Sequence, residues 1–248
     1  MVIGLAFFAT AVSTWFAQAT LVRFTQRRRP HDLAWTIALT MFAVASAALA
    51  VGAATGWDPG TFRVFYAFGA IVNVPWLALG TIFLLAGPNI GRRIQWGLVA
   101  FTGFALGALL VAPIAGTWPS ATIPVGKEVF GALPRILAAV GSSVGALVLF
   151  GGAAWSAIRL LRGMRTSRIP GITARRLAGA NGCIALGTLI LSSGGLLQGA
   201  VGHDQAFAIT LALGITVIYL GFTIASPRTP APADRATDPK SSVEALSR

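Results

Sequence analysis

The 248-residue chain is 55% hydrophobic and only 10% charged, whereas an ordinary globular domain carries about 25% charged residues. So few charges could not cover a water-soluble protein of this size, but the outside of a membrane bundle faces hydrocarbon. The composition therefore favours one compact integral membrane domain and leaves no room for a sizeable soluble domain as well.

Seven stretches of the sequence are apolar and about 20 residues long, which is the length that a helix needs to cross a bilayer. In chain order they are Ile3–Val22, Leu33–Thr55, Thr61–Ala86, Gln95–Gly116, Arg135–Ala157, Leu177–Ala200 and Gln205–Ala225. Alternating segments of about ten residues, typical of membrane barrels, are not seen. The sequence therefore predicts an all-α integral membrane protein, a seven-transmembrane-helix bundle over residues 1–226.

The segments between these stretches contain turn-forming and helix-breaking residues. Asp, Pro and Gly in 56–60, and Pro, Asn and Gly in 87–91, predict tight turns. The longer segment 116–134 is predicted to hold a short interfacial helix around Val125–Ala132. Residues 227–248 combine prolines with Ser, Asp and Arg; such a segment cannot bury a core, so we expect a disordered cytoplasmic tail.

The basic residues are distributed unevenly between the two sides of the predicted bundle. Sixteen of the nineteen fall in alternate loops and the tail, and the other side keeps Arg63, Lys127 and Arg135. The positive-inside rule then places the N-terminus outside and the C-terminus in the cytoplasm. The cytoplasmic arginines expected to contact anionic lipid or a partner include Arg27, Arg28, Arg29, Arg165, Arg175 and Arg176.

The net charge of +12 does not indicate nucleic acid, because the arginines are spread over four segments beside helix ends. Attraction to anionic headgroups, worth about 1 kcal/mol per residue, explains them. The basic residues are almost all arginine, and Ala and Gly are abundant. This composition is typical of GC-rich bacteria and favours the bacterial cytoplasmic membrane as the location.

The predicted spans contain no Asp, Glu, Lys or His within their hydrocarbon cores. Ionisable groups at that depth mark proton relays and ion pathways. Their absence from the sequence weighs against a proton-coupled pump, a retinal Schiff base, a haem held by two histidines and a protease with paired aspartates. One cysteine, Cys183, is too little for a metal site, and no soluble-enzyme motif appears. We expect no cofactor, no metal and no catalytic residue, which disfavours an enzyme.

Neutral polar residues remain as candidates for binding a substrate. In the first span Thr10, Thr14 and Gln18 recur at helical spacing and form one polar stripe. This stripe either packs on another helix or lines a wet cavity. In the sixth span, Asn181 is a further candidate.

The third span carries Asn73 and Pro75 near its middle. Proline removes a backbone donor, so we expect a kink at Pro75 and carbonyl groups that need new partners. Asn73 beside this kink is the best single candidate for a substrate contact, with Tyr66 about two turns earlier on a similar face. The simpler interpretation is a structural kink, with Asn73 bonded to a neighbouring helix.

Pairs of glycines spaced four apart predict close helix packing, either within one chain or between protomers. The fourth, fifth and sixth spans each carry one such pair, namely Gly103 and Gly107, Gly141 and Gly145, and Gly195 and Gly199.

The chain can also be divided into two units of three spans, which the fourth span joins. Each unit has an Arg-rich loop, a span, a short outer loop with one aspartate (Asp58 or Asp204) and a span that ends before a proline. An odd linker helix makes the two units parallel, which is a known transporter plan. The three-one-three arrangement resembles that of SWEET sugar transporters, although the Pro-Gln signature of their repeats is missing.

Two functions are consistent with these features. The first is a transporter or binding bundle for a small neutral or lipid-like molecule, with Asn73, Gln18 and Asn181 facing a central cavity. The second is a non-catalytic membrane subunit or sensor that docks a partner through its Arg-rich loops. A homo-oligomer or a membrane partner is compatible with both.

Overall fold

The computed structural model describes residues 1–115, 122–162, 174–201 and 204–225. Its helices, in chain order, are α1 (Val2–Arg27), α2 (Pro30–Thr55), α3 (Pro59–Tyr66), the π-helix η1 (Ala67–Ile71), α4 (Asn73–Leu85), α5 (Pro88–Val111), α6 (Gly126–Val129), α7 (Ala132–Leu161), α8 (Ala174–Val201) and α9 (Asp204–Ala225). In these residues the only β-type pairing is an isolated bridge between Ile114 and Phe130. The all-helical class is therefore confirmed.

Each of the seven predicted spans overlaps one of these helices or the broken stretch Pro59–Leu85, but the fourth was predicted too long, because α5 ends at Val111 and not at Gly116. Six helical stretches among the described residues are long and apolar enough to cross a membrane: α1, α2, the stretch Pro59–Leu85 made by α3, η1 and α4, α5, most of α7, and α9. In α8 the same criteria find only a shorter apolar stretch, Gly182–Gly195. The structure thus supports a multi-pass membrane protein with six candidate spans, and the crossing by α8 stays a prediction.

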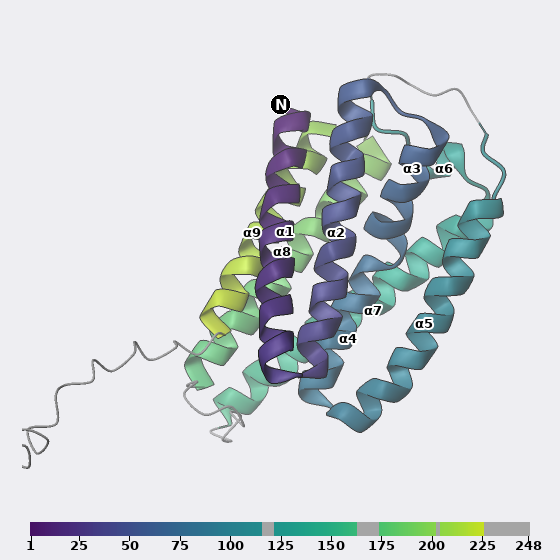
Figure 1. Cartoon of the computed structure of the whole chain (residues 1–248). Helices are drawn as coiled ribbons and strands as arrows, with labels where there is room; N and C mark the ends of the chain where they lie inside the picture. Colours follow the sequence, from purple (N-terminus) through teal and green to yellow (C-terminus); the bar gives the residue numbers. More distant parts are fainter. Residues whose placement is uncertain (116–121, 163–173, 202–203, 226–248) are drawn as a thin grey trace, which may run out of the picture.

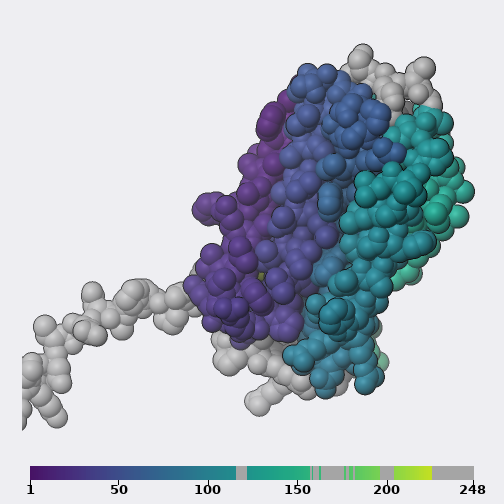
Figure 2. Space-filling model, turned by 45° about the vertical axis from the view of Figure 1, so that its right-hand side comes forward, coloured from purple at the N-terminus to yellow at the C-terminus, as the bar shows by residue number. Residues whose placement is uncertain are grey.

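Six of the long helices form a closed ring, and α5 stands outside it. Around the ring α1 packs on α2, α2 on α4, α4 on α7, α7 on α8, α8 on α9, and α9 returns to α1 (Figure 1). The helix α5 packs against α4 and α7 at the edge of the bundle. In the most apolar 18-residue stretch of α5, only 11% of the residues are buried, against 56% in that of α2. Figure 2 shows the face on which the first helices follow one another, from purple α1 to blue-teal α5.

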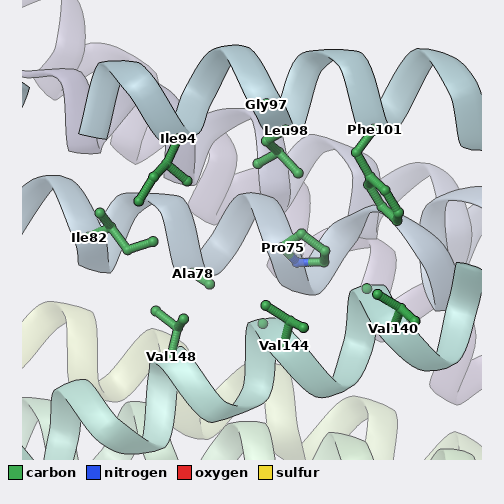
Figure 3. Close-up of a pocket in the computed structure, with 12 residues that line it drawn as sticks. Pro75, Ala78, Ile82, Ile94, Gly97, Leu98, Phe101, Val140, Val144 and Val148 are labelled. Atoms are coloured by element: carbon green, nitrogen blue, oxygen red, sulfur yellow. The ribbon is translucent and has the colours of Figure 1, made fainter. Parts of the chain in front are cut away.

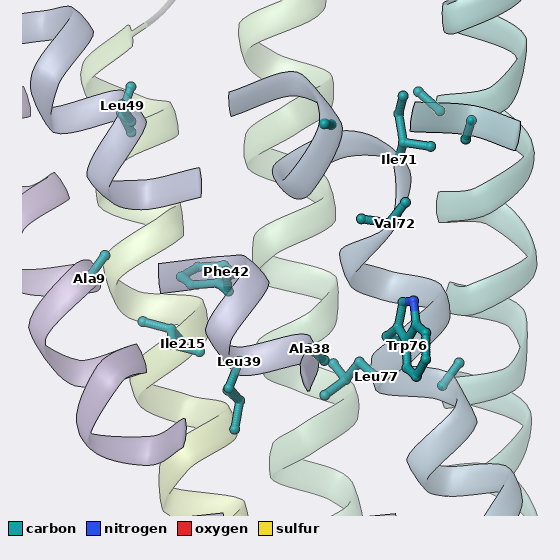
Figure 4. Packing of buried hydrophobic residues seen from close by; sticks show 14 of the residues in the cluster. Ala9, Ala38, Leu39, Phe42, Leu49, Ile71, Val72, Trp76, Leu77 and Ile215 are labelled. Carbon is teal, nitrogen blue, oxygen red and sulfur yellow. The ribbon is translucent and has the colours of Figure 1, made fainter. Parts of the chain in front are cut away.

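The core of the ring combines small residues with large aliphatic and aromatic ones. Ala9 of α1 and Leu49 of α2 are completely buried, and Ile215 of α9 is 2% exposed. Figure 4 shows these side chains on their three helices, together with other residues of the core. Alanines on α1 allow it to approach α2 closely, as is usual where helices pack in lipid.

Arginines gather at one end of the bundle, here called the arginine-rich end. It contains the turn after α1, with Arg27 and Arg28, and the start of α5, with Arg92 and Arg93. The α2–α3 turn and α6 lie at the opposite end, which is at the top of Figure 1.

The third predicted span is broken in its middle, as Pro75 led us to expect. The α-helix gives way to the π-helix Ala67–Ile71, bends at Val72 and restarts at Asn73. The disruption lies one turn before the proline because the missing N–H of Pro75 is the one that would bond to the carbonyl of Ile71. A neighbouring helix supplies a new donor, since Ser142 Oγ of α7 donates to the carbonyl of Ala70 at 2.7 Å.

The predicted turn at 56–60 is present, and Asp58 caps the helix that follows it. Its carboxylate accepts hydrogen bonds from the backbone N–H groups of Gly60, at 2.8 Å, and Thr61, at 3.1 Å, and from the Thr61 hydroxyl. These bonds, led by that of the Thr61 hydroxyl, hold the pKa of Asp58 below its usual value. The cap supplies partners for helix N–H groups that would otherwise have none.

We expect Asp58→Ala to lower the free energy of unfolding by about 1 kcal/mol at neutral pH. Because the pKa of Asp58 is lowered by folding, this contribution is present above the unfolded pKa and is lost as the pH falls through the folded value. Chemical unfolding in detergent, compared at pH 7 and at the lowest pH at which the protein stays soluble, measures it. Asp58→Asn is the control, since asparagine also caps helices but does not titrate. A loss for Asp58→Ala that is unchanged at low pH would contradict the assignment.

Candidate functional site

An apolar groove of about 330 Å³ lies between α4, α5 and α7. Every residue that lines it is apolar: Pro75, Ala78, Ile82, Ile94, Gly97, Leu98, Phe101, Val140, Gly141, Val144, Gly145 and Val148. Figure 3 shows α4 as its floor, with α5 and α7 as its two walls. Its volume lies at the lower end of the range for small-molecule sites, which is about 300–1,000 Å³.

The groove opens sideways from the bundle. Its wall residues Ile94, Val140 and Val144 are 40%, 49% and 57% exposed. Because these helices are candidate membrane spans, an opening at this level faces lipid tails. A molecule could therefore enter from the bilayer without crossing a polar surface.

The groove exists because α5 is held to the bundle at particular points. At the end of the bundle opposite the arginine-rich end, Arg63 of α3 donates to the carbonyls of Leu109 and Ala112, at 3.2 and 2.8 Å. Near the middle, Trp76 Nε1 donates to Thr102 Oγ1 at 3.1 Å. Between this middle bond and the start of α5, the wall helices leave the gap.

The start of α5 returns to α4 at the arginine-rich end. A Cβ atom added to Gly91 would lie 2.2 Å from Phe83 Cδ1, so the glycine allows close contact there. The groove is therefore a pocket along part of α5, bounded by contacts on both sides, and not a general separation of that helix.

Asn73, the leading candidate from the sequence, does not line this groove. Its side chain is buried, and its Nδ2 donates to the carbonyl of Ala38 in α2 at 2.8 Å. The bond joins the restarted half of the broken span to its neighbour in the ring. Asn73 thus has the packing contact that was the simpler of the two interpretations.

The structure does not bring the other polar candidates together with Asn73. Thr14 and Gln18 are exposed on the outside of α1. Tyr66 lies in an aromatic cluster at the end opposite the arginines, with its ring centroid 5.0 Å from that of Phe130. Asn181 belongs to α8, but its side chain lies outside the described residues.

Of the predicted polar stripe on the first span, only Thr10 faces a neighbouring helix, and Thr20 does so as well. Thr10 Oγ1 donates to Ser46 Oγ at 3.0 Å, and Thr36 Oγ1 donates to Thr20 Oγ1 at 2.9 Å. The polar side of α1 that meets α2 therefore runs through Thr10 and Thr20 and does not include Gln18. These hydrogen bonds join the two helices, which is the packing alternative for the stripe.

The predicted glycine pairs differ in what surrounds them. A Cβ atom at Gly141 would lie 2.5 Å from the carbonyl oxygen of Ile71, and one at Gly145 would lie 2.9 Å from the carbonyl carbon of Val74. The pair on α7 therefore rests directly on the broken backbone of the third span. At Gly103 and Gly107 of α5, an added Cβ atom meets nothing within 4 Å.

The sixth span shows the same contrast within one helix. An added Cβ atom at Gly195 meets nothing within 4 Å. The surroundings of Gly199 lie outside what the structure describes. The close approach is instead at Gly187, where a Cβ atom would lie 2.7 Å from the carbonyl oxygen of Gly214 in α9. Neither Gly187 nor Gly214 stood out in the sequence, because each lacks a partner glycine four residues away.

The arginine-rich end also holds a buried contact between a histidine and a carboxyl group that the sequence did not suggest. His31 and Asp32 were expected in a loop but lie in the first turn of α2. Asp32 is only 4% exposed, and its Oδ1 lies 3.6 Å from His31 Nε2. Nearby, Arg23 lies 4.1 Å from the centroid of Phe222. This cluster joins α1, α2 and α9.

The predicted cytoplasmic arginines are only partly described. Arg27 and Arg28 are exposed, Arg29 is half-buried, and Arg176 is half-buried at the start of α8. Arg165 and the side chain of Arg175 lie outside the described residues.

The centre of the six-helix ring is nearly filled. A small cavity of about 20 Å³ lies there, between residues from all six helices, including Phe16, Trp35, Thr81, Leu149, Ile184 and Ile218. Trp35 and Phe222 cross edge to face, with centroids 6.1 Å apart. A ligand could therefore reach the centre only after these side chains move.

Comparison with known proteins adds nothing to this geometry. No family model matches the sequence, and neither curated proteins nor solved structures gave a match. Among the described residues, no three His, Cys, Asp or Glu side chains come together as a metal site.

Proposed function

We propose that the protein is a membrane-embedded binding bundle that holds a lipid-like molecule in the groove between α4, α5 and α7. The observation that carries the proposal is the groove itself, which is wholly apolar and open to the side. Asn73 and the polar side of α1 are occupied by hydrogen bonds between helices. A lipid-like ligand thus fits better than a small polar one.

Gly97 allows the groove to be filled without disturbing the fold. It lines the groove, and a Cβ atom added there meets nothing within 4 Å. Gly103 lies six residues further along the same helix, about 120° around its axis from Gly97. It does not line the groove, and its surroundings are equally open. Gly97→Leu should therefore block the groove, while Gly103→Leu changes only the outer face of α5.

We expect phosphatidylcholine carrying a photoreactive diazirine in mid-chain to label groove residues of the protein in nanodiscs, as mapped by mass spectrometry. Gly97→Leu should reduce the labelling of 94–101 and 140–148 at least fivefold, because the leucine occupies the space of the chain. Gly103→Leu should leave that labelling unchanged. Equal labelling of the groove and of the outer face of α5, insensitive to Gly97→Leu, would show ordinary annular lipid and contradict the proposal.

We further propose that the chain crosses the membrane seven times, with α8 as the sixth span, the N-terminus outside and the arginine-rich end in the bacterial cytoplasm. The charge distribution of the loops supports this orientation. The position of α8 between α7 and α9 in the ring supports its crossing, since a helix that packs along two spanning neighbours shares their depth.

Single cysteines introduced after Cys183→Ser test this topology. An impermeant maleimide added to intact cells should label Lys127→Cys and Gln205→Cys. It should reach Thr173→Cys and Ser226→Cys only after the cells are permeabilised. Labelling of Thr173→Cys and Gln205→Cys from the same side would mean that α8 does not cross.

A second candidate function is transport through the centre of the ring, and one observation favours it. Around the ring, α1, α2 and α4 are followed by α7, α8 and α9, so each helix of the first unit lies three positions from its counterpart in the second. This order is expected for two parallel three-helix units with α5 as linker. Uptake into proteoliposomes that is abolished by Thr81→Trp but unaffected by Gly97→Leu would favour this function over lipid binding in the groove.

A further inference from the structure

Two arginines precede the groove-lining residues of α5. Along α5, the lining residues Ile94, Leu98 and Phe101 recur at helical spacing. Directly before them, Arg92 and Arg93 are both exposed, about 3 Å or less from Ile94 along the axis. Side chains on a helix lean toward its N-terminus, which here is the arginine-rich end. Both arginines therefore lie toward the arginine-rich end of the groove, with Arg93 about 100° and Arg92 about 160° around the helix axis from Ile94.

The depth of the groove matches part of one lipid chain. From Ile94 to Phe101 the rise along α5 is about 10 Å, and from Val140 to Val148 along α7 it is about 12 Å. Half of a typical hydrocarbon core is about 15 Å. Trp96 is 74% exposed on α5, and tryptophans at such positions mark the membrane–water interface. The groove thus runs from the interface into one leaflet, as an inserted acyl chain does.

Neither arginine has a carboxylate partner within the described residues. Asp32 is buried in α2, where its Oδ1 lies 3.6 Å from His31 Nε2. The other described carboxylates, Asp58, Glu128 and Asp204, lie at the opposite end of the bundle. A positive charge at the interface without a protein counter-ion attracts an anionic headgroup, and a guanidinium matches the geometry of a phosphate.

We infer that the occupant of the groove is an anionic phospholipid, with one acyl chain between α5 and α7 and its phosphate headgroup at Arg92 and Arg93. This inference rests on the proposed lipid-binding function and adds selection for the headgroup. A free phosphate would leave the apolar groove empty, and a zwitterionic lipid would leave the two charges unneutralised.

The test compares two diazirine phospholipids with the same chains, phosphatidylglycerol and phosphatidylcholine, with the full chain in nanodiscs. Adducts on residues 94–101 and 140–148 are counted by mass spectrometry. We expect phosphatidylglycerol to label the groove more strongly than phosphatidylcholine. Arg92→Gln with Arg93→Gln should reduce this preference by about fivefold for each arginine removed and leave labelling by phosphatidylcholine unchanged.

A matched control removes two charges at the same end but away from the groove. Arg27 and Arg28 are exposed at the turn between α1 and α2, so Arg27→Gln with Arg28→Gln should keep the preference. Loss of the preference in this control as well would mean general attraction to the basic surface and would overturn the inference.

The remaining outcomes separate the inference from the function on which it rests. Equal groove labelling by both lipids that is blocked by Gly97→Leu would overturn headgroup selection and retain lipid binding. An absence of specific groove labelling by either lipid would overturn both.

Discussion

Gly141→Leu should lower the free energy of unfolding by about 3 kcal/mol, which is among the largest effects expected for a single substitution in this protein. A Cβ atom at this position would lie 2.5 Å from the carbonyl oxygen of Ile71 and 3.4 Å from the ring of Pro75. The atom that it meets first is backbone in a segment already fixed by a π-turn and a proline. The segment cannot move aside, so α7 would have to separate from α4.

Thermal unfolding in detergent, followed by size-exclusion chromatography, measures this loss. Gly103→Leu is the control, because an added Cβ atom there meets nothing within 4 Å. Both substitutions gain the same helix propensity, so the difference between them isolates the contact with Ile71. Equal stability of the two variants would show that α7 does not rest on the broken span.

Gly187→Leu, at the contact between α8 and α9, should also lower the free energy of unfolding by about 3 kcal/mol. A Cβ atom there would lie 2.7 Å from the carbonyl oxygen of Gly214 and 2.6 Å from Ile218 Cγ1. The two backbones approach closely because both residues are glycine, which is a usual way for helices to associate in lipid. A leucine would push the helices apart and open the ring.

The same unfolding assay applies, with Gly195→Leu on the same helix as control. The surroundings of Gly195 are open, so its replacement should cost little. A destabilisation by Gly195→Leu that matches that of Gly187→Leu would place the important contact of α8 elsewhere.

The groove follows from the same packing that these substitutions probe. Pro75 and Gly141 both line it, and Ser142 holds the broken backbone through the carbonyl of Ala70. The kink bends the third span, and the glycines of α7 let it follow the bend closely. The outer helix α5, joined to the bundle at Arg63 and Trp76, bridges the gap that remains.

The candidate binding residues chosen from the sequence were polar, whereas those that line the proposed groove are apolar. Ile94, Leu98 and Phe101 do recur on one face of α5. In a helix that is apolar on all sides, however, this spacing has no contrast with the other faces. The usable signals were Pro75 and the pair Gly141 and Gly145, which mark a kink and a close contact.

The sequence by itself determined the all-helical, multi-pass membrane class, the approximate positions of the long helices and the break near Pro75. These properties depend on local quantities: the length of an apolar run, the charges of a loop and the missing N–H of Pro75. The turn capped by Asp58 was also predictable, because its residues interact with their near neighbours.

Only the tertiary structure decided which face of each helix meets another. The glycine pair on α7 is in contact and the one on α5 is not, although the spacing is identical. Asn73 donates to Ala38, while Gln18 faces outward. Within a bilayer, polarity does not separate inward from outward faces, because lipid tails are as apolar as leucine. The arrangement therefore depends on close packing between distant segments, which a single sequence does not reveal.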